Sequence, residues 1–477
     1  MIFNSFQFLW LFPIIFGIYY LAACLFKGKT KNKASNILLL VISYLLYMQW
    51  NPAYTLILLG ITLCTYFAAI IIENKKAYGN KKYIITTGAL LTFLPLIIFK
   101  YYNFILSIFN DLFALVGMNC GLNGLNWAIP IGLSFFTFQA VGYLWDVYYK
   151  KFKAERNIID YMLFVAFFPQ IMSGPISKAS SLLPQIKADR AFNYSSAVQG
   201  LKWLLWGFFL KTVMADRLGM YVDTVYGNFE HYNGLTCLFA TILYSFQIYG
   251  DFAGYSLMAI GVGRLLGFDL INNFNRPYFS ASITEFWRRW HISLSTWLKD
   301  YIYIPLGGNR CSKLRSYWNI VVTFLVSGIW HGANWTFIIW GLIHGALQII
   351  EKALNMQKCD SKGFVKIGRI LLTFLLVNFA WIFFRMPDFS SAIDFCTNIF
   401  FNFNGKLYTS NNTDFAMILF SLSIVFTSEL CAEISNNKIN FMNNKNTAVR
   451  WCTYLALITI ILLFGVFDSS QFIYVSF

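Results

Sequence analysis

Charged side chains are scarce in this chain. Asp, Glu, Lys and Arg make up 12% of its 477 residues, whereas 58% are hydrophobic; about a quarter of the residues in a typical soluble domain are charged. This scarcity argues against a soluble fold and predicts an integral membrane protein. Carboxylates are the rarest charge, with 21 Asp and Glu against 37 Lys and Arg. Because many lysines lie in short loops beside apolar runs, the positive charge indicates membrane orientation and not nucleic-acid binding.

Familiar catalytic and cofactor motifs are also missing. The sequence has no Walker loop, no HExxH motif and no GxSxG elbow, and residues 261–267 have the wrong glycine spacing for a dinucleotide fingerprint. The nine cysteines are scattered without a CxxC pair, which supports neither a disulfide framework nor a zinc site. We therefore expect no metal and no permanently bound cofactor. An enzyme of this kind needs a cosubstrate that is activated elsewhere.

Long apolar runs are present along the whole chain, and we expect about 9–12 membrane spans. The clearest runs are 6–26, 37–50, 54–72, 83–99, 129–149, 367–384, 415–432 and 451–467. Residues 104–118 are expected to lie in the interface or to re-enter. Basic segments are expected on the cytoplasmic side, namely 27–33, 75–82, 150–156, 352–366 and 436–450. Both termini, including the aromatic segment 471–477, are then predicted to face outward.

Between residues 159 and 290 the apolar runs are shorter and are broken by Pro169, Pro175, Pro184 and several glycines. Irregular backbone at membrane depth persists only where protein or a water-filled cavity surrounds it. We therefore expect a tunnel or funnel enclosed by helices. No internal repeat or soluble domain is visible, so residues 1–477 are interpreted as one all-α polytopic membrane domain with additional re-entrant or interfacial helices.

Histidine is rare as well, and three of the four histidines lie close together in the sequence. His331 belongs to a span-like run, residues 318–340, and has Gly328 and Gly332 on either side. These small neighbours are expected to leave room for a substrate. Asn334 is three residues on, a spacing that shares a helical face. We predict that His331 takes a proton from a hydroxyl group and that the Asn334 amide orients a reacting group.

His291 ends the string Arg288-Arg289-Trp290-His291, and Ser295 follows on the same face if the segment is helical. Guanidinium groups match phosphate geometry, so the two arginines could receive a phosphorylated carrier or cofactor. The alternative is an interfacial helix whose arginines reach lipid headgroups and whose tryptophans form an aromatic belt. The residues alone leave these two interpretations equal.

The remaining polar candidates have simpler interpretations. His344 is expected to be a packing residue, and His231, in a polar loop, is expected to be solvated. Asp251 lies within apolar sequence and therefore needs a partner, for which Arg264 and Arg288 are the candidates. An ion pair that fixes helix packing and a role in the site are equally consistent with this aspartate.

Taken in order, these strings resemble the membrane-bound O-acyltransferase family, in particular its bacterial branch of alginate O-acetylases and the teichoic-acid D-alanyl transfer membrane protein. The strongest are Trp-Arg-Arg-Trp-His at 287–291 and Trp-His-Gly-Ala-Asn-Trp at 330–335. The matching stretches are 130–139, 167–175, 215–218, 247–256, 273–278, 285–297, 304–308 and 328–335. The resemblance runs from the first span to about residue 385, with its core at about 130–345.

The resemblance implies a helical funnel that takes an acyl donor from the cytoplasmic side and passes the acyl group toward an outer acceptor. The family's key histidine corresponds to His331 and its second histidine to His291. The donor would be an acyl thioester, acetyl-CoA or an acyl-carrier protein. The implied surroundings are the inner membrane and its lipid, a polysaccharide acceptor and an extracytoplasmic SGNH-type acyltransferase partner.

We therefore expect an O-acyltransferase that moves a short acyl group, acetyl, toward hydroxyls of an extracytoplasmic polysaccharide. His291 and the adjacent arginines would position the donor. One alternative is D-alanyl transfer to a cell-wall polymer. Two others come from different classes: a glycan transporter whose broken helices line a permeation path, and a non-catalytic scaffold for a secreted acyltransferase.

Overall fold

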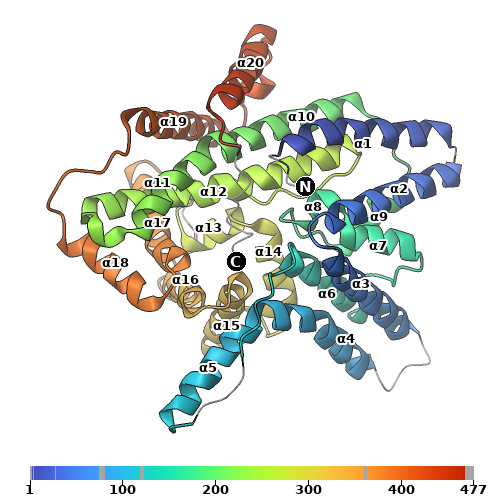
Figure 1. Ribbon diagram of the computed structural model, residues 1–477, viewed down its shortest axis with the longest axis horizontal. Helices are drawn as coiled ribbons and strands as arrows, with labels where there is room; N and C mark the ends of the chain where they lie inside the picture. Colours follow the sequence, from blue (N-terminus) through green and yellow to red (C-terminus); the bar gives the residue numbers. More distant parts are fainter. Residues whose placement is uncertain are drawn as a thin grey trace. The chain divides into compact units, whose positions relative to one another are not determined.

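The computed structural model of the chain describes residues 3, 5–26, 28–74, 81–118, 123–358 and 362–467. Every regular element within these ranges is helical (Figure 1). The first half comprises α1 (Phe6–Leu25), α2 (Gly28–Met48), α3 (Pro52–Glu73), α4 (Lys81–Leu96), the π-helix η2 (Ile97–Tyr101), α5 (Tyr102–Leu115), α6 (Leu133–Tyr148), α7 (Ile158–Ala166), α8 (Phe168–Ile171), α9 (Ala179–Lys187), α10 (Tyr194–Phe208), the π-helix η3 (Phe209–Ala215) and α11 (Asp216–Gly227).

The second half begins with the long helix α12. It comprises η4 (Phe229–His231), α12 (Gly234–Leu265), η5 (Pro277–Phe279), α13 (Ile283–Arg289), α14 (Ile292–Leu298), the π-helix η6 (Lys299–Tyr303), α15 (Lys313–His331), α16 (Trp335–Ala353), α17 (Phe364–Arg385), α18 (Phe389–Phe401), α19 (Asn412–Ile434), η7 (Phe441–Asn443) and α20 (Thr447–Phe464). Helix α12 runs unbroken for 32 residues, although its sequence lies in the stretch where we expected short, irregular helices.

Six helical stretches in the described part are long and apolar enough to cross a membrane. They are α1, α3, residues 81–115, α17, α19 and α20. The predicted class, an all-α multi-pass membrane protein, is thereby confirmed. Residues 81–115 are continuous helix through α4, η2 and α5, so 104–118 do not form the separate interfacial or re-entrant element that we expected. The aromatic segment 471–477 and the lysines at 75 and 76 lie outside the described residues.

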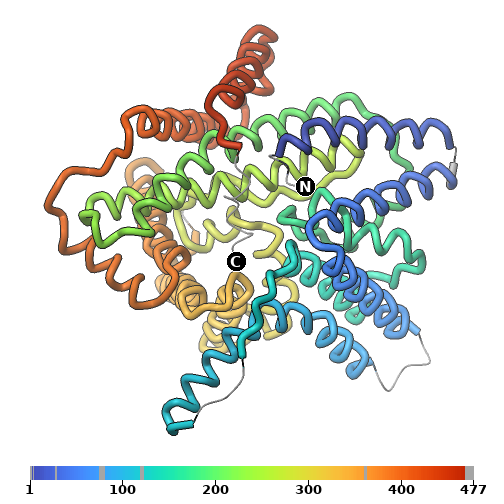
Figure 2. Tube along the Cα trace, in the orientation of Figure 1, coloured from blue at the N-terminus to red at the C-terminus, as the bar shows by residue number. Residues whose placement is uncertain are grey.

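Packing divides the chain into two units. The first contains residues 6–200 and 262–271, and the second contains 201–261 and most of the chain from 272 onward. In the first unit α3 packs against α4 and α6, and α2 packs against α7 (Figure 2). Asn36 joins α2 to this core, because its amide donates to Asp160 Oδ1 at 2.8 Å and to the carbonyl of Ile186 at 3.0 Å.

The second unit is organised around the antiparallel pair α15 and α16, beside which α17 packs (Figure 1). Helix α13 is held against α16 by a shared cap. The Ser282 hydroxyl accepts from the backbone N–H of Glu285 at 3.0 Å, a standard helix N-cap. Glu351 on α16 accepts from the N–H of Thr284, also at 3.0 Å. A carboxylate at a helix N-terminus is favoured by the helix dipole, so this contact both caps α13 and fixes its position.

Candidate active site

Three histidines of the second unit belong to one buried aromatic cluster. The ring centroid of His331 lies 4.9 Å from that of Trp330 and 5.0 Å from that of Trp340. Trp330 also contacts His291, at 5.8 Å, and Trp340 contacts His344, at 5.0 Å. Two tryptophans therefore join histidines that the chain separates by up to 53 positions, from 291 to 344.

His331 is the last residue of α15 and is 3% exposed. A Cβ on Gly332 would lie 2.1 Å from Cε2 of Phe337, and a Cβ on Gly328 would lie 2.3 Å from the Phe337 carbonyl oxygen. Both positions are too close for any side chain. The expectation that these glycines leave room for a substrate is wrong: they allow α16 to pack tightly beside the histidine.

Asn334 does not share a helical face with His331, because α15 ends at His331 and Asn334 is the N-cap of α16. Its side-chain oxygen accepts from the Thr336 N–H at 3.1 Å, and its amide nitrogen donates to the carbonyl of Pro387 at 2.5 Å. Both ends of the amide are thus occupied in joining the start of α16 to the end of α17. The apolar run at 318–340 is therefore two helices and not one span.

His291 occupies the junction between α13 and α14 with a left-handed backbone conformation, φ 41°. The residue is fully buried, and its ring packs on Phe252 at a centroid distance of 4.6 Å. Burial lowers the pKa of His291 to about 3, because the imidazolium form loses its hydration. The ring is therefore neutral at physiological pH and supplies no positive charge to a ligand.

A cavity of about 420 Å³ opens beside this cluster, between α13, α14, η6, α15 and α16. Three cationic side chains line it, Arg288, Lys299 and Lys352, and no carboxylate does so among the described residues. Ser295 lines it too. We call this space the cationic cavity. Its charge suits a phosphate-bearing ligand.

One wall of the cationic cavity leads toward His331. Thr323 and Ser327 line the cavity from α15, and they precede His331 by eight and four residues. Residues four apart lie on the same face of a helix, one turn above another. His331 therefore lies one helical turn beyond the wall of the cavity, although its own side chain does not line it.

The two arginines predicted together have different surroundings. Arg289 pairs with Glu285 at 2.7 Å and with both oxygens of Glu433 at 3.1 Å. Trp290 is 1% exposed and packs on Trp381 at 5.1 Å. Both therefore serve packing in this structure. Arg288 is exposed, and its side chain makes no ion pair with any described residue, which leaves it available to a ligand.

Asp251 has a different partner from those expected. The ammonium group of Lys211 lies 2.5 Å from Asp251 Oδ1 and 2.6 Å from Asp216 Oδ1, and all three side chains are almost fully buried. Lys211 belongs to the π-helix η3, a form often found at functional positions. Arg264 pairs instead with Asp269 at 2.8 Å.

From the sequence, no site role and no ion pair was assigned to four of these charged residues, namely Lys211, Lys299, Lys352 and Glu433. Lys299 was visible in the charged stretch near His291, and Lys352 begins a basic segment that was used only for orientation. Either could have been found by asking which cations follow the histidine strings. Glu433 gave no local signal, because Arg289 is 144 residues away in the chain. Lys211 has one near partner, Asp216, but its contact with Asp251 spans 40 residues.

Comparison with known proteins identifies the family of the chain. The profile of the MBOAT, membrane-bound O-acyltransferase family, matches residues 151–386. Over 395 residues the chain is 38% identical to a probable alginate O-acetylase AlgI of Pseudomonas aeruginosa, covering 82% of this chain and 73% of that protein. It is 35% identical over 421 residues to a peptidoglycan O-acetyltransferase of Helicobacter pylori, covering 82% and 78%.

A more distant relative is a teichoic acid D-alanyltransferase of Streptococcus thermophilus, which is 31% identical over 252 residues, covering 50% of this chain and 60% of that protein. The matched region contains the cationic cavity and the three clustered histidines. The chain belongs to the membrane-bound O-acyltransferase family and is a multi-pass membrane O-acyltransferase.

Proposed function

We propose that this protein moves an acetyl group from a cytoplasmic thioester toward hydroxyl groups of an extracytoplasmic polysaccharide, in the cytoplasmic membrane. The observation that carries the proposal is the position of His331 on α15, one helical turn beyond Ser327, which lines the cationic cavity. Two relatives match 82% of this chain, and both are named as O-acetylating proteins. Their names support acetyl as the group that is transferred.

The donor is assigned to the cationic cavity. Coenzyme A and the pantetheine arm of a carrier protein both bear phosphate, which Arg288, Lys299 and Lys352 can bind. The cavity lining includes Lys352 and Gln357, which both belong to the basic segment 352–366. Because basic segments face the cytoplasm, this end of the second unit opens toward the compartment that supplies thioesters. Both termini are then assigned to the opposite side.

His331 is assigned as the general base. Its imidazole takes the proton of the attacking hydroxyl while the oxygen forms a bond to the thioester carbonyl carbon. The carbon–sulfur bond then breaks, and the thiolate leaves with the proton that the imidazole returns. The attacking hydroxyl belongs to the polysaccharide or to a partner acyltransferase of the SGNH type that relays the group.

The crowded surroundings of His331 favour a short acyl group. Trp340 and Phe384 pack on the imidazole at centroid distances of 5.0 and 5.2 Å, and Phe337 fills the space beside Gly332. A two-carbon group fits such a site with small adjustments, whereas a long chain would have to displace several rings. D-Alanyl transfer remains the second candidate, supported by the relative that covers half of this chain.

The test is the ester-linked acetyl content of the surface polysaccharide in cells that lack the protein and are supplied with wild type, His331→Ala or His331→Gln. We expect wild type to restore the acetyl esters and both variants to fail at equal membrane abundance, with a loss of at least ~10²-fold in transfer. Esters restored by a His331 variant would refute the base assignment. Alanyl esters in place of acetyl would favour the second candidate, and the scaffold and transporter interpretations both predict full rescue.

A further inference from the structure

A separate cavity of about 430 Å³ lies in the second unit, and its lining includes none of the three clustered histidines. Two segments far apart in the chain form it: the turn of η4 with the first residues of α12, and residues 402–408 between α18 and α19. We call this cavity the loop pocket. Neither segment contributes to the cationic cavity.

The frame of the loop pocket is built from hydrogen bonds that involve the backbone. The N–H of Gly234 donates to the carbonyl of Asn402 at 2.5 Å, and the Asn233 amide donates to the carbonyl of Lys406 at 3.0 Å. The N–H of Tyr408 donates to the Thr236 hydroxyl at 3.1 Å. The two segments are therefore fixed to one another without using the outward-pointing polar side chains.

Those outward side chains are available to a ligand. Glu230, His231, Asn402 and Asn404 are exposed, and their side chains make no hydrogen bond or ion pair with any residue that the structure describes. Together they offer carboxylate acceptors, amide groups that both donate and accept, and an imidazole that does either. This mixture matches sugar hydroxyls, each of which donates and accepts at once.

Two tyrosine rings in the lining of the loop pocket also suit a sugar. The rings of Tyr232 and Tyr408 are half-buried and lie 4.9 Å apart between centroids, tilted by 48°. Aromatic rings present apolar faces on which the C–H face of a pyranose packs. The pocket's formal charges, Glu230 and Lys406, cancel. A sugar segment fits this pocket better than a phosphate group does, because an anion would need a net positive lining.

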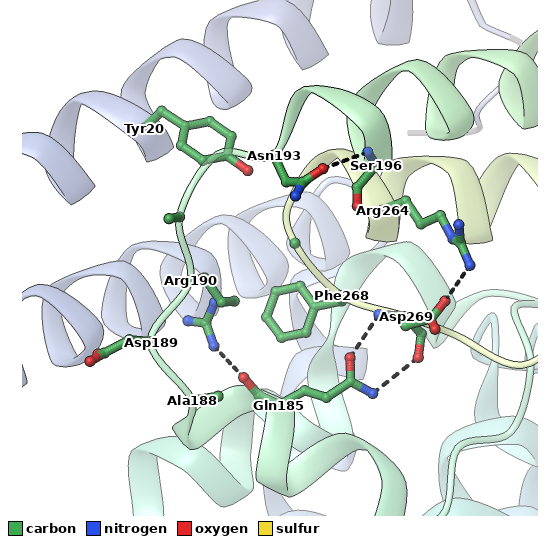
Figure 3. A pocket seen from close by; sticks show the side chains of 12 residues that line it. Tyr20, Gln185, Ala188, Asp189, Arg190, Asn193, Ser196, Arg264, Phe268 and Asp269 are labelled. Atoms are coloured by element: carbon green, nitrogen blue, oxygen red, sulfur yellow. Dashed lines mark hydrogen bonds and ion pairs between the residues drawn. The ribbon is translucent and has the colours of Figure 1, made fainter.

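A third cavity, of about 340 Å³ in the first unit, provides a contrast (Figure 3). There the polar side chains bind one another: Asp269 pairs with Arg264 at 2.8 Å, and the Gln185 amide donates to the Asp269 carbonyl at 3.0 Å. Arg190 donates to the carbonyl of Gln185 at 2.7 Å. Most of the polar groups in this cavity hold loops together in this way, as the dashed lines in Figure 3 show, although the Asp189 carboxylate takes no part.

We propose that the loop pocket binds a sugar segment of the acceptor polysaccharide and so recruits the polymer to the enzyme. The assignment of side rests on the proposed function and its orientation. The basic segment 352–366 precedes α17, and residues 402–408 follow α17 and the short helix α18, which is not among the candidate spans, so the pocket faces outward. Holding the chain here raises the local concentration of hydroxyl groups at the membrane surface.

The test measures binding to purified full-length protein in detergent. The probe is the surface polysaccharide of the producing cell, freed of esters by mild alkali and cut to short oligosaccharides. We expect wild type to bind it, and His231→Ala/Asn404→Ala to bind it about tenfold more weakly through the loss of two hydrogen-bonding groups. Asn126→Ala, an exposed asparagine outside the pocket, should bind like wild type.

Absence of binding by wild type, or equal binding by the double variant, would overturn the proposal. Thermal unfolding of each variant shows whether it is folded, and a double variant that unfolds early is replaced by Asn404→Ala alone, with the same expectation in direction. Because no donor is present, the result does not depend on acyl transfer. If wild-type protein binds the oligosaccharide but does not restore acetyl esters to cells that lack it, the proposed function is refuted and this binding site still stands.

Discussion

The guanidinium of Arg289 forms two parallel hydrogen bonds with the carboxylate of Glu433, each 3.1 Å long, across 144 residues of chain. Glu433 lies near the end of α19 and also accepts from Arg276 Nε at 2.7 Å. One carboxylate thus fixes α19 to the segment that carries His291. Paired geometry of this kind gives position as well as energy.

Replacing Glu433 by Gln should destabilise the protein by about 1–3 kcal/mol, because two partly buried arginines lose a charged acceptor. Thermal unfolding in detergent measures the effect. Asp394→Asn on α18 is the control, since that carboxylate is exposed and pairs with no described residue. Equal unfolding temperatures for the two variants would show that the Glu433 pairs contribute nothing.

Lys211→Met should be far more damaging than Asp251→Asn. Removing the lysine leaves two buried carboxylates without the cation that both contact, a loss of about 3–5 kcal/mol. Removing one carboxylate leaves the Lys211–Asp216 pair at 2.6 Å intact. The amount of folded protein in the membrane and its unfolding temperature should therefore rank wild type, Asp251→Asn, Lys211→Met. The reverse ranking would contradict the pairing that the structure shows.

The lowered pKa of the buried His291 ring should make the stability of the protein depend on pH. Its pKa is about 3 when buried in the folded protein and about 6.5 in water, so the unfolded chain binds this proton first. The contribution of the neutral His291 ring to the free energy of unfolding is therefore complete above pH ~6.5 and is lost as the pH falls toward 3. We expect the unfolding temperature to decline below pH ~6.5, and less steeply in His291→Gln than in wild type. Parallel curves would mean that the folded protein does not hold this ring neutral.

Arg288→Gln should raise KM for the thioester donor about tenfold and leave kcat nearly unchanged, since a phosphate contact away from the reacting carbonyl binds substrate and transition state alike. Arg315→Gln, an exposed arginine of α15 outside the cationic cavity, serves as the control. Acetyl transfer at varied donor concentration separates the two constants. A fall in kcat alone would place Arg288 nearer the chemistry.

Gly332→Ala should cost about 1–3 kcal/mol and most of the activity, because the new methyl group meets the Phe337 ring at 2.1 Å. Phe337→Leu added to it should restore part of both, as expected for two residues in contact. Gly368→Ala on α17 meets no atom within 4 Å and should be neutral. Activity and unfolding temperature are measured for all three. Failure of the second substitution to compensate would argue against this contact.

The spans were predictable because the length of an apolar run is a local property. The expected run at 6–26 became α1 (Phe6–Leu25), and that at 367–384 became α17 (Phe364–Arg385). The break after His331 was not predictable, since Gly332 and Asn334 are embedded in a run that is apolar on both sides. A single glycine weakens a helix without identifying where it ends.

The candidate site was predictable only in part, because its motifs are local in sequence and its pairing contacts are not. The histidine strings identified the region, but sequence could not separate Arg288 from Arg289. Only the fold brings Glu433 to one of them and a cavity to the other. Buried ion pairs follow from which helices meet, and that information is spread over the whole chain. The partner of Asp251 is Lys211, 40 residues earlier, in a π-helix that no periodicity indicates.

Trp290, Trp340 and Trp381 also bear on how a cell keeps its proton gradient. Each is at most 1% exposed and belongs to the unit that carries both the cationic cavity and the loop pocket. Protons leak through proteins along threads of water, and close-packed apolar rings hold no such threads. If the acyl group passes this unit as proposed, the packed rings would deny protons a continuous file of water along the same route, so transfer would not discharge the membrane potential.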